Sequence, residues 1–121
     1  METGKKNIKL SKSAYNMRDI INENDWFIRP DKLYAFAVAV HLKKFKNGEA
    51  PPITNIEENS GLAANTFDPN QNLAKLVNIY RPDADKLNDT LESWISSGLE
   101  LMLDTYNKTG SFELDDYFPL D

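Results

Sequence analysis

Residues 7–10 (Asn-Ile-Lys-Leu) alternate between polar and apolar side chains, and this two-residue period is typical of a short, half-buried strand. Directly after them, Ser11 or Ser13 can cap a helix, which an apolar stripe predicts over residues 14–23. Pro30 then has the fixed φ that suits a first helical position, and apolar residues at helical spacing continue a second helix to about Phe45. The first third of the chain therefore has the predicted order strand, helix, helix.

The rest of the chain contains one aperiodic stretch and two further helical patterns. Residues 49–70 have no period, so they predict a long loop of the kind that has a function or is mobile. A third helix is predicted around residues 73–80, and a fourth from Asp83 or Asp85 onward. The fourth has the strongest periodicity, and we expect it to bury the stripe formed by Leu87, Leu91, Trp94, Ile95, Leu99, Met102, Leu103 and Tyr106. The predicted fold class is mostly α, a small four-helix domain with a short N-terminal strand.

The length and the charge distribution divide this domain into parts. A chain of 121 residues has the size of one small domain, which we expect to extend over residues 1–121. Residues 1–46 carry ten basic and five acidic side chains, a net charge of +5, whereas the remainder carries four basic and fourteen acidic ones, a net charge of −10. We therefore distinguish a basic strand-helix-helix part (1–48), the long loop (49–70), an acidic helical part (71–106) and an acidic and aromatic tail (107–121). The tail could dock on a neighbour or on a basic partner.

The composition excludes several kinds of site. The chain has no cysteine, which excludes disulfides, thiolate nucleophiles and Cys-ligated zinc. Its only histidine, His41, is expected on the surface or lining a groove rather than acting as a general base. We interpret the acidic pairs Asp83-x-Asp85 and Asp115-Asp116 as caps or tail charge rather than as metal ligands. We therefore predict a protein that is not an enzyme and has no cofactor and no bound metal.

The same sequence indicates where the protein is found. No apolar run approaches the roughly 18 residues that a membrane span needs, and the first ten residues have charges but no apolar segment typical of a signal peptide. We therefore expect a cytoplasmic protein without membrane contact.

The order strand, helix, helix within residues 7–46 resembles a ribbon-helix-helix module, in which two chains pair their strands into an antiparallel ribbon that enters the DNA major groove. Alternation would direct Ile8 and Leu10 into a dimer core, and the start of the second helix near Arg29 could meet a phosphate. The candidate nucleic-acid-binding residues are accordingly Lys5, Lys6, Asn7, Lys9, Lys12, Arg29, Lys43 and Lys44.

The second helix also carries a run of small residues. Ala35, Ala37 and Ala39 are small enough for another backbone to approach closely. Together with the two oppositely charged parts of the chain, they predict self-association into a homo-oligomer whose charged contacts weaken with added salt.

A wider resemblance covers residues 8–104 in element order. Its matching segments are Ile8-Lys9-Leu10-Ser11-Lys12, the helix from Arg29-Pro30 to Leu42, Pro51-Pro52, Gly61 to Phe67 (Gly-Leu-Ala-Ala-Asn-Thr-Phe) and Trp94 to Leu99. Together these segments resemble the DndE family of DNA sulfur-modification proteins. The resemblance implies a small helical, oligomeric, non-enzymatic DNA-binding component of the bacterial machinery for DNA phosphorothioation and phage defence. It also implies arginine near the positions of Asn65 and Ser97, which this chain lacks.

Charge and resemblance together predict a non-enzymatic DNA-binding accessory subunit of a bacterial DNA-modification or antiviral defence system. Its expected partners are duplex DNA and larger protein subunits of the same system. The alternative is a protein-interaction or scaffold subunit of a multiprotein defence complex that has no DNA contact of its own. Salt separates the two, because the logarithm of a DNA affinity falls linearly with the logarithm of salt concentration as counterions are released.

Overall fold

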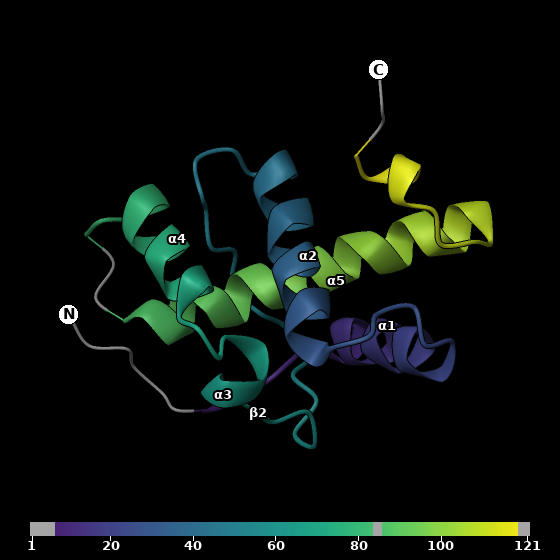
Figure 1. The fold of residues 1–121 in the computed structure, drawn as a ribbon, viewed down its shortest axis with the longest axis horizontal. Coiled ribbons are helices and arrows are strands. Elements are labelled where there is room, and N and C mark those ends of the chain that lie inside the picture. The colour runs from purple at the N-terminus through teal and green to yellow at the C-terminus, as the bar shows by residue number, and fades with distance from the viewer. Residues whose placement is uncertain (1–6, 84–85, 119–121) are drawn as a thin grey trace.

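The computed structural model describes residues 7–83 and 86–118, and Figure 1 shows their arrangement. The domain is mostly helical and has a short strand near its N-terminus, as the sequence predicted, and this strand belongs to a two-stranded sheet. Its elements in chain order are β1 (Asn7–Ile8), α1 (Lys12–Glu23), α2 (Pro30–Lys44), β2 (Leu62–Ala63), α3 (Ala64–Phe67), α4 (Asn72–Tyr80), α5 (Leu87–Thr109) and the 3-10 turn η1 (Leu114–Asp116). The four predicted helices correspond to α1, α2, α4 and α5, and the one-turn α3 is an addition.

Helix α5 is the central element, because α1, α2 and α4 all pack against it (Figure 1). Most of the predicted stripe is buried, and five of its residues have no exposed surface: Leu91, Trp94, Ile95, Leu99 and Met102. Its last two residues, Leu103 and Tyr106, are half-buried. Full burial of an apolar side chain contributes roughly 1.5–3 kcal/mol to stability. The longest helix of the domain therefore also provides the largest share of its core.

Helix α2 crosses α5 where neither helix has a bulky side chain. A Cβ atom built on Gly98 would lie 1.9 Å from the carbonyl oxygen of Ala37, so no residue larger than glycine fits there without a backbone shift. The expected close approach to α2 therefore occurs at Ala37, which is fully buried. The other two residues of the small-residue run, Ala35 and Ala39, are exposed on another side of the helix.

Strand β1 pairs in antiparallel fashion with β2 of the same chain, with Asn7 opposite Ala63 and Ile8 opposite Leu62. The predicted alternation is confirmed, since Ile8 and Leu10 are fully buried and Asn7 is exposed. The partner differs from the expected one, because the ribbon-helix-helix reading paired this strand with a second chain. Strand β2 comes from the predicted loop, and two residues are too short to show a period in the sequence.

Residues 49–70, which the sequence predicted to be one long loop, include two short elements. They contain β2 and α3, and side-chain hydrogen bonds attach them to the core. Ser93 Oγ on α5 donates to the Pro51 carbonyl oxygen at 2.5 Å, and the Leu10 amide donates to Ser60 Oγ at 2.7 Å. This segment therefore has a structural role, in covering α5 and the strand that precedes α1.

Helix α1 starts at a predicted capping residue, whereas α5 starts later than predicted. Ser11 caps α1, since its Oγ accepts from the Ala14 amide at 3.1 Å, and the same hydroxyl donates to Glu100 on α5 at 2.6 Å. Helix α5 begins at Leu87 rather than at Asp83, and the other proposed start, Asp85, lies outside the described residues.

The described part of the tail folds back on its own chain. Tyr117 is buried, and its hydroxyl donates to the Met102 carbonyl oxygen at 3.1 Å. Burial, with a contribution from the charge of Asp116, raises the pKa of Tyr117 to about 12. Phe112 stacks on Trp26 with ring centroids 4.7 Å apart. The structure thus shows this segment docked on α5 and on the α1–α2 connection, where the sequence suggested a neighbour or a basic partner.

Candidate functional site

Helix α2 is apolar on nearly all sides, although only one side is covered. Its inner face consists of the buried residues Leu33, Tyr34, Ala37, Val38, Val40 and His41. Its outer face, which we define as Ala35, Ala39 and Leu42, is also apolar, but Ala35 and Ala39 are exposed and Leu42 is half-buried. A helix that is apolar all round is normally buried all round. The outer face of α2 is therefore the first feature that calls for a functional explanation.

Helix α4 lies beside this outer face and forms the second wall of a groove. The two helices enclose a hollow of about 520 Å3, which Phe118 also borders. A smaller hollow of about 90 Å3 continues toward the N-terminal end of α2 and is lined by Asp31 and Lys32. We call the whole feature the α2/α4 groove, whose apolar surface is formed by Ala35, Ala39, Leu42, Leu73, Leu76 and Tyr80.

Asp68 sets the position of α4 and so of the second wall. Its carboxylate accepts hydrogen bonds from the amides of Leu73 at 2.9 Å and Ala74 at 3.0 Å, in the first turn of the helix. Gln71, the residue that precedes α4, provides no side-chain cap and has a left-handed backbone with φ 59°. A carboxylate at this end also interacts favourably with the helix dipole. Asp68 therefore acts as the cap of α4.

The charged side chains that border the groove differ in whether they have partners. The Asp31 carboxylate accepts from Arg29 at 2.9 and 3.1 Å, and Asp68 is engaged by α4. Lys32 and Lys75 are exposed, and neither has an ion-pair partner within residues 7–83 and 86–118. Lys75 lies one turn from Asn72, which lines both hollows. The groove thus combines an apolar floor with two exposed ammonium groups at its edges.

Lys43 stands at the other end of the groove. Its Nζ donates to the Tyr117 carbonyl oxygen and lies 5.3 Å from the centre of the Phe118 ring. An ammonium group has three N–H donors. The bond to Tyr117 uses one of them, so Lys43 can still meet an anion placed over the groove.

His41 is fully buried between α2 and α5, so the expectation that it lies on the surface or lines a groove was wrong. Its Nδ1 is 2.8 Å from Ser97 Oγ, and its Nε2 is 2.7 Å from the Glu49 carbonyl oxygen. A carbonyl oxygen only accepts, so Nε2 carries the proton and Nδ1 accepts from the Ser97 hydroxyl. Burial lowers the pKa of His41. Both ring nitrogens are therefore used to fix the segment after α2 to α5.

The predicted nucleic-acid-binding residues lie at several separate places. Lys5 and Lys6 lie outside the described residues. The others are divided among the β1–α1 junction (Asn7, Lys9, Lys12), the start of α2 (Arg29) and its end (Lys43, Lys44). A helix rises 1.5 Å per residue, so about 21 Å separates Arg29 from Lys43 along α2. The first three residues are neighbours in the chain, whereas the two ends of α2 lie far apart.

Two of these basic residues have acidic partners. Lys9 Nζ is 2.5 Å from Glu58 Oε2, and this contact lowers the pKa of Glu58. The Lys9 amide also donates to Glu92 at 2.8 Å. Arg29 pairs with Asp31, as described above. Acidic side chains from the segment before β2 and from α5 therefore offset the positive charge expected along β1.

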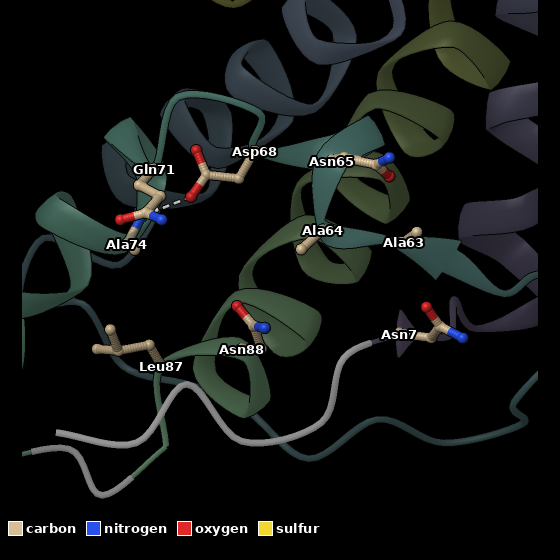
Figure 2. Close-up of a pocket in the computed structure, with 9 residues that line it drawn as sticks. All are labelled: Asn7, Ala63, Ala64, Asn65, Asp68, Gln71, Ala74, Leu87 and Asn88. Carbon is tan, nitrogen blue, oxygen red and sulfur yellow. Dashed lines mark hydrogen bonds between the residues drawn. The ribbon is translucent and has the colours of Figure 1, made fainter.

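A second hollow of about 480 Å3 lies between the sheet, α3, α4 and the start of α5 (Figure 2). Four amide side chains line it: Asn7, Asn65, Gln71 and Asn88. Figure 2 shows Asp68 directed toward the first turn of α4, where the dashed line marks its bond to the Ala74 amide. Asn7 was a predicted DNA contact, and Asn65 is a position at which the DndE resemblance implies arginine. Apart from Asp68, the side chains that line this hollow are uncharged.

The sequence predicted neither the α2/α4 groove nor the hollow beside the sheet. Each joins residues far apart in the chain, so no local spacing predicts it. One signal for the groove was present in the sequence, because residues 33–42 are apolar on every side of a helix. Ala35 and Ala39 lie on a side of that helix against which no other predicted element was expected to pack.

In the described ranges, no group of three or more His, Cys, Asp or Glu side chains is placed to hold a metal ion, and no helix has the length and apolar character needed to cross a bilayer.

Comparisons with known proteins identify no relative of this chain. No family model, no curated protein and no solved structure matches the chain, so the resemblance to the DndE family remains a prediction from the sequence.

Proposed function

We propose that this protein is a non-enzymatic protein-interaction subunit that joins a multiprotein complex through the α2/α4 groove. The observation that supports this proposal is the apolar outer face of α2, which α4 borders without covering. Exposed apolar surface that is continuous and edged by charged groups is typical of a protein-binding site. Ile79 extends this surface on α4, where it is 71% exposed.

The complex that we propose is a bacterial DNA-modification or anti-phage defence system. This part of the proposal is based on the resemblance of residues 8–104 to the DndE family. In such a system a small subunit without a catalytic centre would hold larger subunits together or bring them to DNA.

The test is to block the groove without adding charge. The double variant Ala35→Gln and Ala39→Gln places two longer side chains on the outer face, and glutamine is well tolerated on a helix. A matched control, Ser13→Gln with Asn107→Gln, makes two substitutions at exposed positions of α1 and α5. Tagged full-length chains would be purified from the native host, and the mass and composition of the complex would be measured by light scattering and mass spectrometry.

We expect the wild-type chain and the control to purify in a stoichiometric complex with larger subunits, and the Ala35→Gln and Ala39→Gln variant to purify without them. Circular dichroism should show the same helical content in all three. If the Ala35→Gln and Ala39→Gln variant retains the whole complex, the proposal is overturned.

The second candidate function is direct contact with duplex DNA. It is favoured by three exposed lysines within four positions at the end of α2, namely Lys43, Lys44 and Lys46. Binding of a 20-base-pair duplex would be measured over a series of salt concentrations, where each neutralised phosphate contributes a slope of about −0.9. Replacing Lys44 and Lys46 by Glu should then make the slope less negative by about two, because two phosphate contacts are lost. Absence of duplex binding at low salt would exclude this candidate.

A further inference from the structure

We propose that the α2/α4 groove binds an acidic amphipathic helix of a partner protein. This inference rests on the proposed function and adds the chemistry of the partner. Three properties of the groove support it: its floor, its length and the sign of its charges.

The floor of the groove is shaped for a helix. Ala35 and Ala39 lie one turn apart on α2 and have the smallest side chains that a helix surface offers apart from glycine. The wall on α4 is taller, because it consists of Leu73, Leu76 and Tyr80. A helix laid over the alanines could therefore approach α2 closely while its apolar side chains contact the α4 wall. Recognition of this kind depends on anchors at positions i, i+3 or i+4, and i+7.

The length of the groove matches about three helical turns. Lys32 lines its N-terminal hollow and Lys43 lines its main hollow. These residues are 11 positions apart on α2, which corresponds to about 17 Å at 1.5 Å per residue. A parallel or antiparallel partner helix would place carboxylates opposite both lysines if they were also about 11 positions apart.

The charges at the groove favour an acidic partner. Lys32 and Lys75 are exposed without ion-pair partners among the described residues, and Lys43 has N–H donors to spare. The two carboxylates that line the groove are both hydrogen-bonded, Asp31 to Arg29 and Asp68 to the amides of α4. Complementary charge at the edge of an interface raises the rate of association and suppresses unsuitable partners.

A second copy of this chain fits the groove less well. Two grooves facing each other would bring Lys32, Lys43 and Lys75 close to the same residues of the other copy, and like charges oppose such a contact. The exposed apolar and acidic segment of this chain, η1, has only three residues and cannot provide three helical turns. The occupant that we propose is therefore a different protein.

The experiment uses the full-length chain and two designed 18-residue peptides as probes. Both peptides carry leucine at positions i, i+4, i+7 and i+11, but one has glutamate at the flanking positions and the other has lysine there. Binding would be measured by fluorescence anisotropy at low and at physiological salt, and the site would be mapped by backbone NMR shifts. The groove variant is Lys32→Glu with Lys75→Glu. The matched control is Lys12→Glu with Lys108→Glu, which makes the same change in net charge at exposed positions of α1 and α5.

We expect the acidic peptide to bind at least ten times more tightly than the basic one and to shift residues of α2 and α4. The groove variant should weaken its binding about tenfold, because two rim attractions become repulsions, while the control should change it by less than about threefold. Equal affinity for both peptides, or equal loss in the groove variant and the control, would overturn the inference.

Further outcomes separate this inference from the proposed function. If the Ala35→Gln and Ala39→Gln variant loses the native complex but the acidic peptide does not bind, the interaction role stands and the acidic helix is wrong. Light scattering that shows a dimer dissolved by the same variant would assign the groove to a second copy instead. If the groove variant weakens duplex binding and leaves peptide binding unchanged, the groove lysines serve DNA and the inference is wrong.

Discussion

The inner and outer faces of α2 are both apolar, yet only the inner face is buried in the fold. The inner face meets α5 so closely that Gly98 is required opposite Ala37. The outer face, with Ala35 and Ala39, meets only the open groove beside α4. The chain thus provides a complementary surface for one face and none, within the described residues, for the other. We interpret this difference as the division between folding and function in this helix.

The two faces should also differ in how much a substitution changes the free energy of unfolding. A substitution on the inner face must disturb packing that contributes to folding, whereas one on the outer face meets mostly solvent and should affect folding little. Stability and assembly measurements on the two faces should therefore give opposite results.

The largest effect is expected at Trp94, which is fully buried and whose Nε1 donates to the Gly48 carbonyl oxygen at 3.0 Å. Trp94→Ala should lower the free energy of unfolding by about 3–5 kcal/mol, because it removes a core aromatic and leaves a cavity. Denaturant unfolding would measure the change. The comparison residue is Ile79, 71% exposed on α4, where alanine should cost less than about 0.5 kcal/mol. A loss below 1 kcal/mol at Trp94 would contradict its place in the core.

The second effect concerns the crossing itself. Gly98→Ala should lower the free energy of unfolding by about 3 kcal/mol, since overpacking against a backbone carbonyl outweighs the better helix propensity of alanine. Gly61→Ala is the control, because no atom lies within 4 Å of the added Cβ there. If both variants unfold at the same denaturant concentration, α2 and α5 do not approach as closely as described.

A smaller effect is expected at the wall of the groove. Asp68→Ala removes the carboxylate that caps α4 and should cost about 1–2 kcal/mol. The loss should be local, so amide hydrogen exchange in α4 should accelerate more than exchange in α1. Asp68→Asn is the conservative variant, and it should recover part of the stability because its amide oxygen can still accept one bond. Uniform acceleration across all helices would argue against a local cap.

The buried histidine makes stability depend on pH. Burial lowers the pKa of His41 in the folded state below its ordinary value of 6.5, so the folded protein binds the proton less readily than the unfolded chain. The stability contribution is fully present above pH 6.5 and is lost as the pH falls below that value, because the unfolded state takes up the proton first. The midpoint of urea unfolding should therefore decrease between pH 7.5 and 5.5. In His41→Gln this decrease should be smaller, and an unchanged pH profile would contradict the assignment.

The smallest effect on stability is expected on the outer face. Ala35→Gln with Ala39→Gln should change the free energy of unfolding by less than about 0.5 kcal/mol, since both positions are exposed. The same double variant is expected to prevent assembly with larger subunits. Loss of several kcal/mol in the isolated chain would mean that the outer face is covered within the fold, and the contrast between the two faces would disappear.

Local patterns in the sequence were sufficient for the main helices. The repeat of Leu91, Trp94, Ile95 and Leu99 predicted the buried face of α5, because a helical period read along the chain directly reports which side is apolar. Ser11 and Pro30 marked the starts of α1 and α2 for similarly local reasons, capping and fixed φ. Each of these features depends on residues within a few positions of one another.

Contacts between distant parts of the chain could be identified only in the tertiary structure. Neither the pairing of β1 with β2 nor the bonds from His41 to Ser97 and Glu49 leave a trace in local spacing. The same holds for the α2/α4 groove, whose walls come together only because both helices pack on α5. Periodicity showed that α2 is apolar on all sides, but which of those sides stays open depends on where the other helices lie, and only the folded chain determines that.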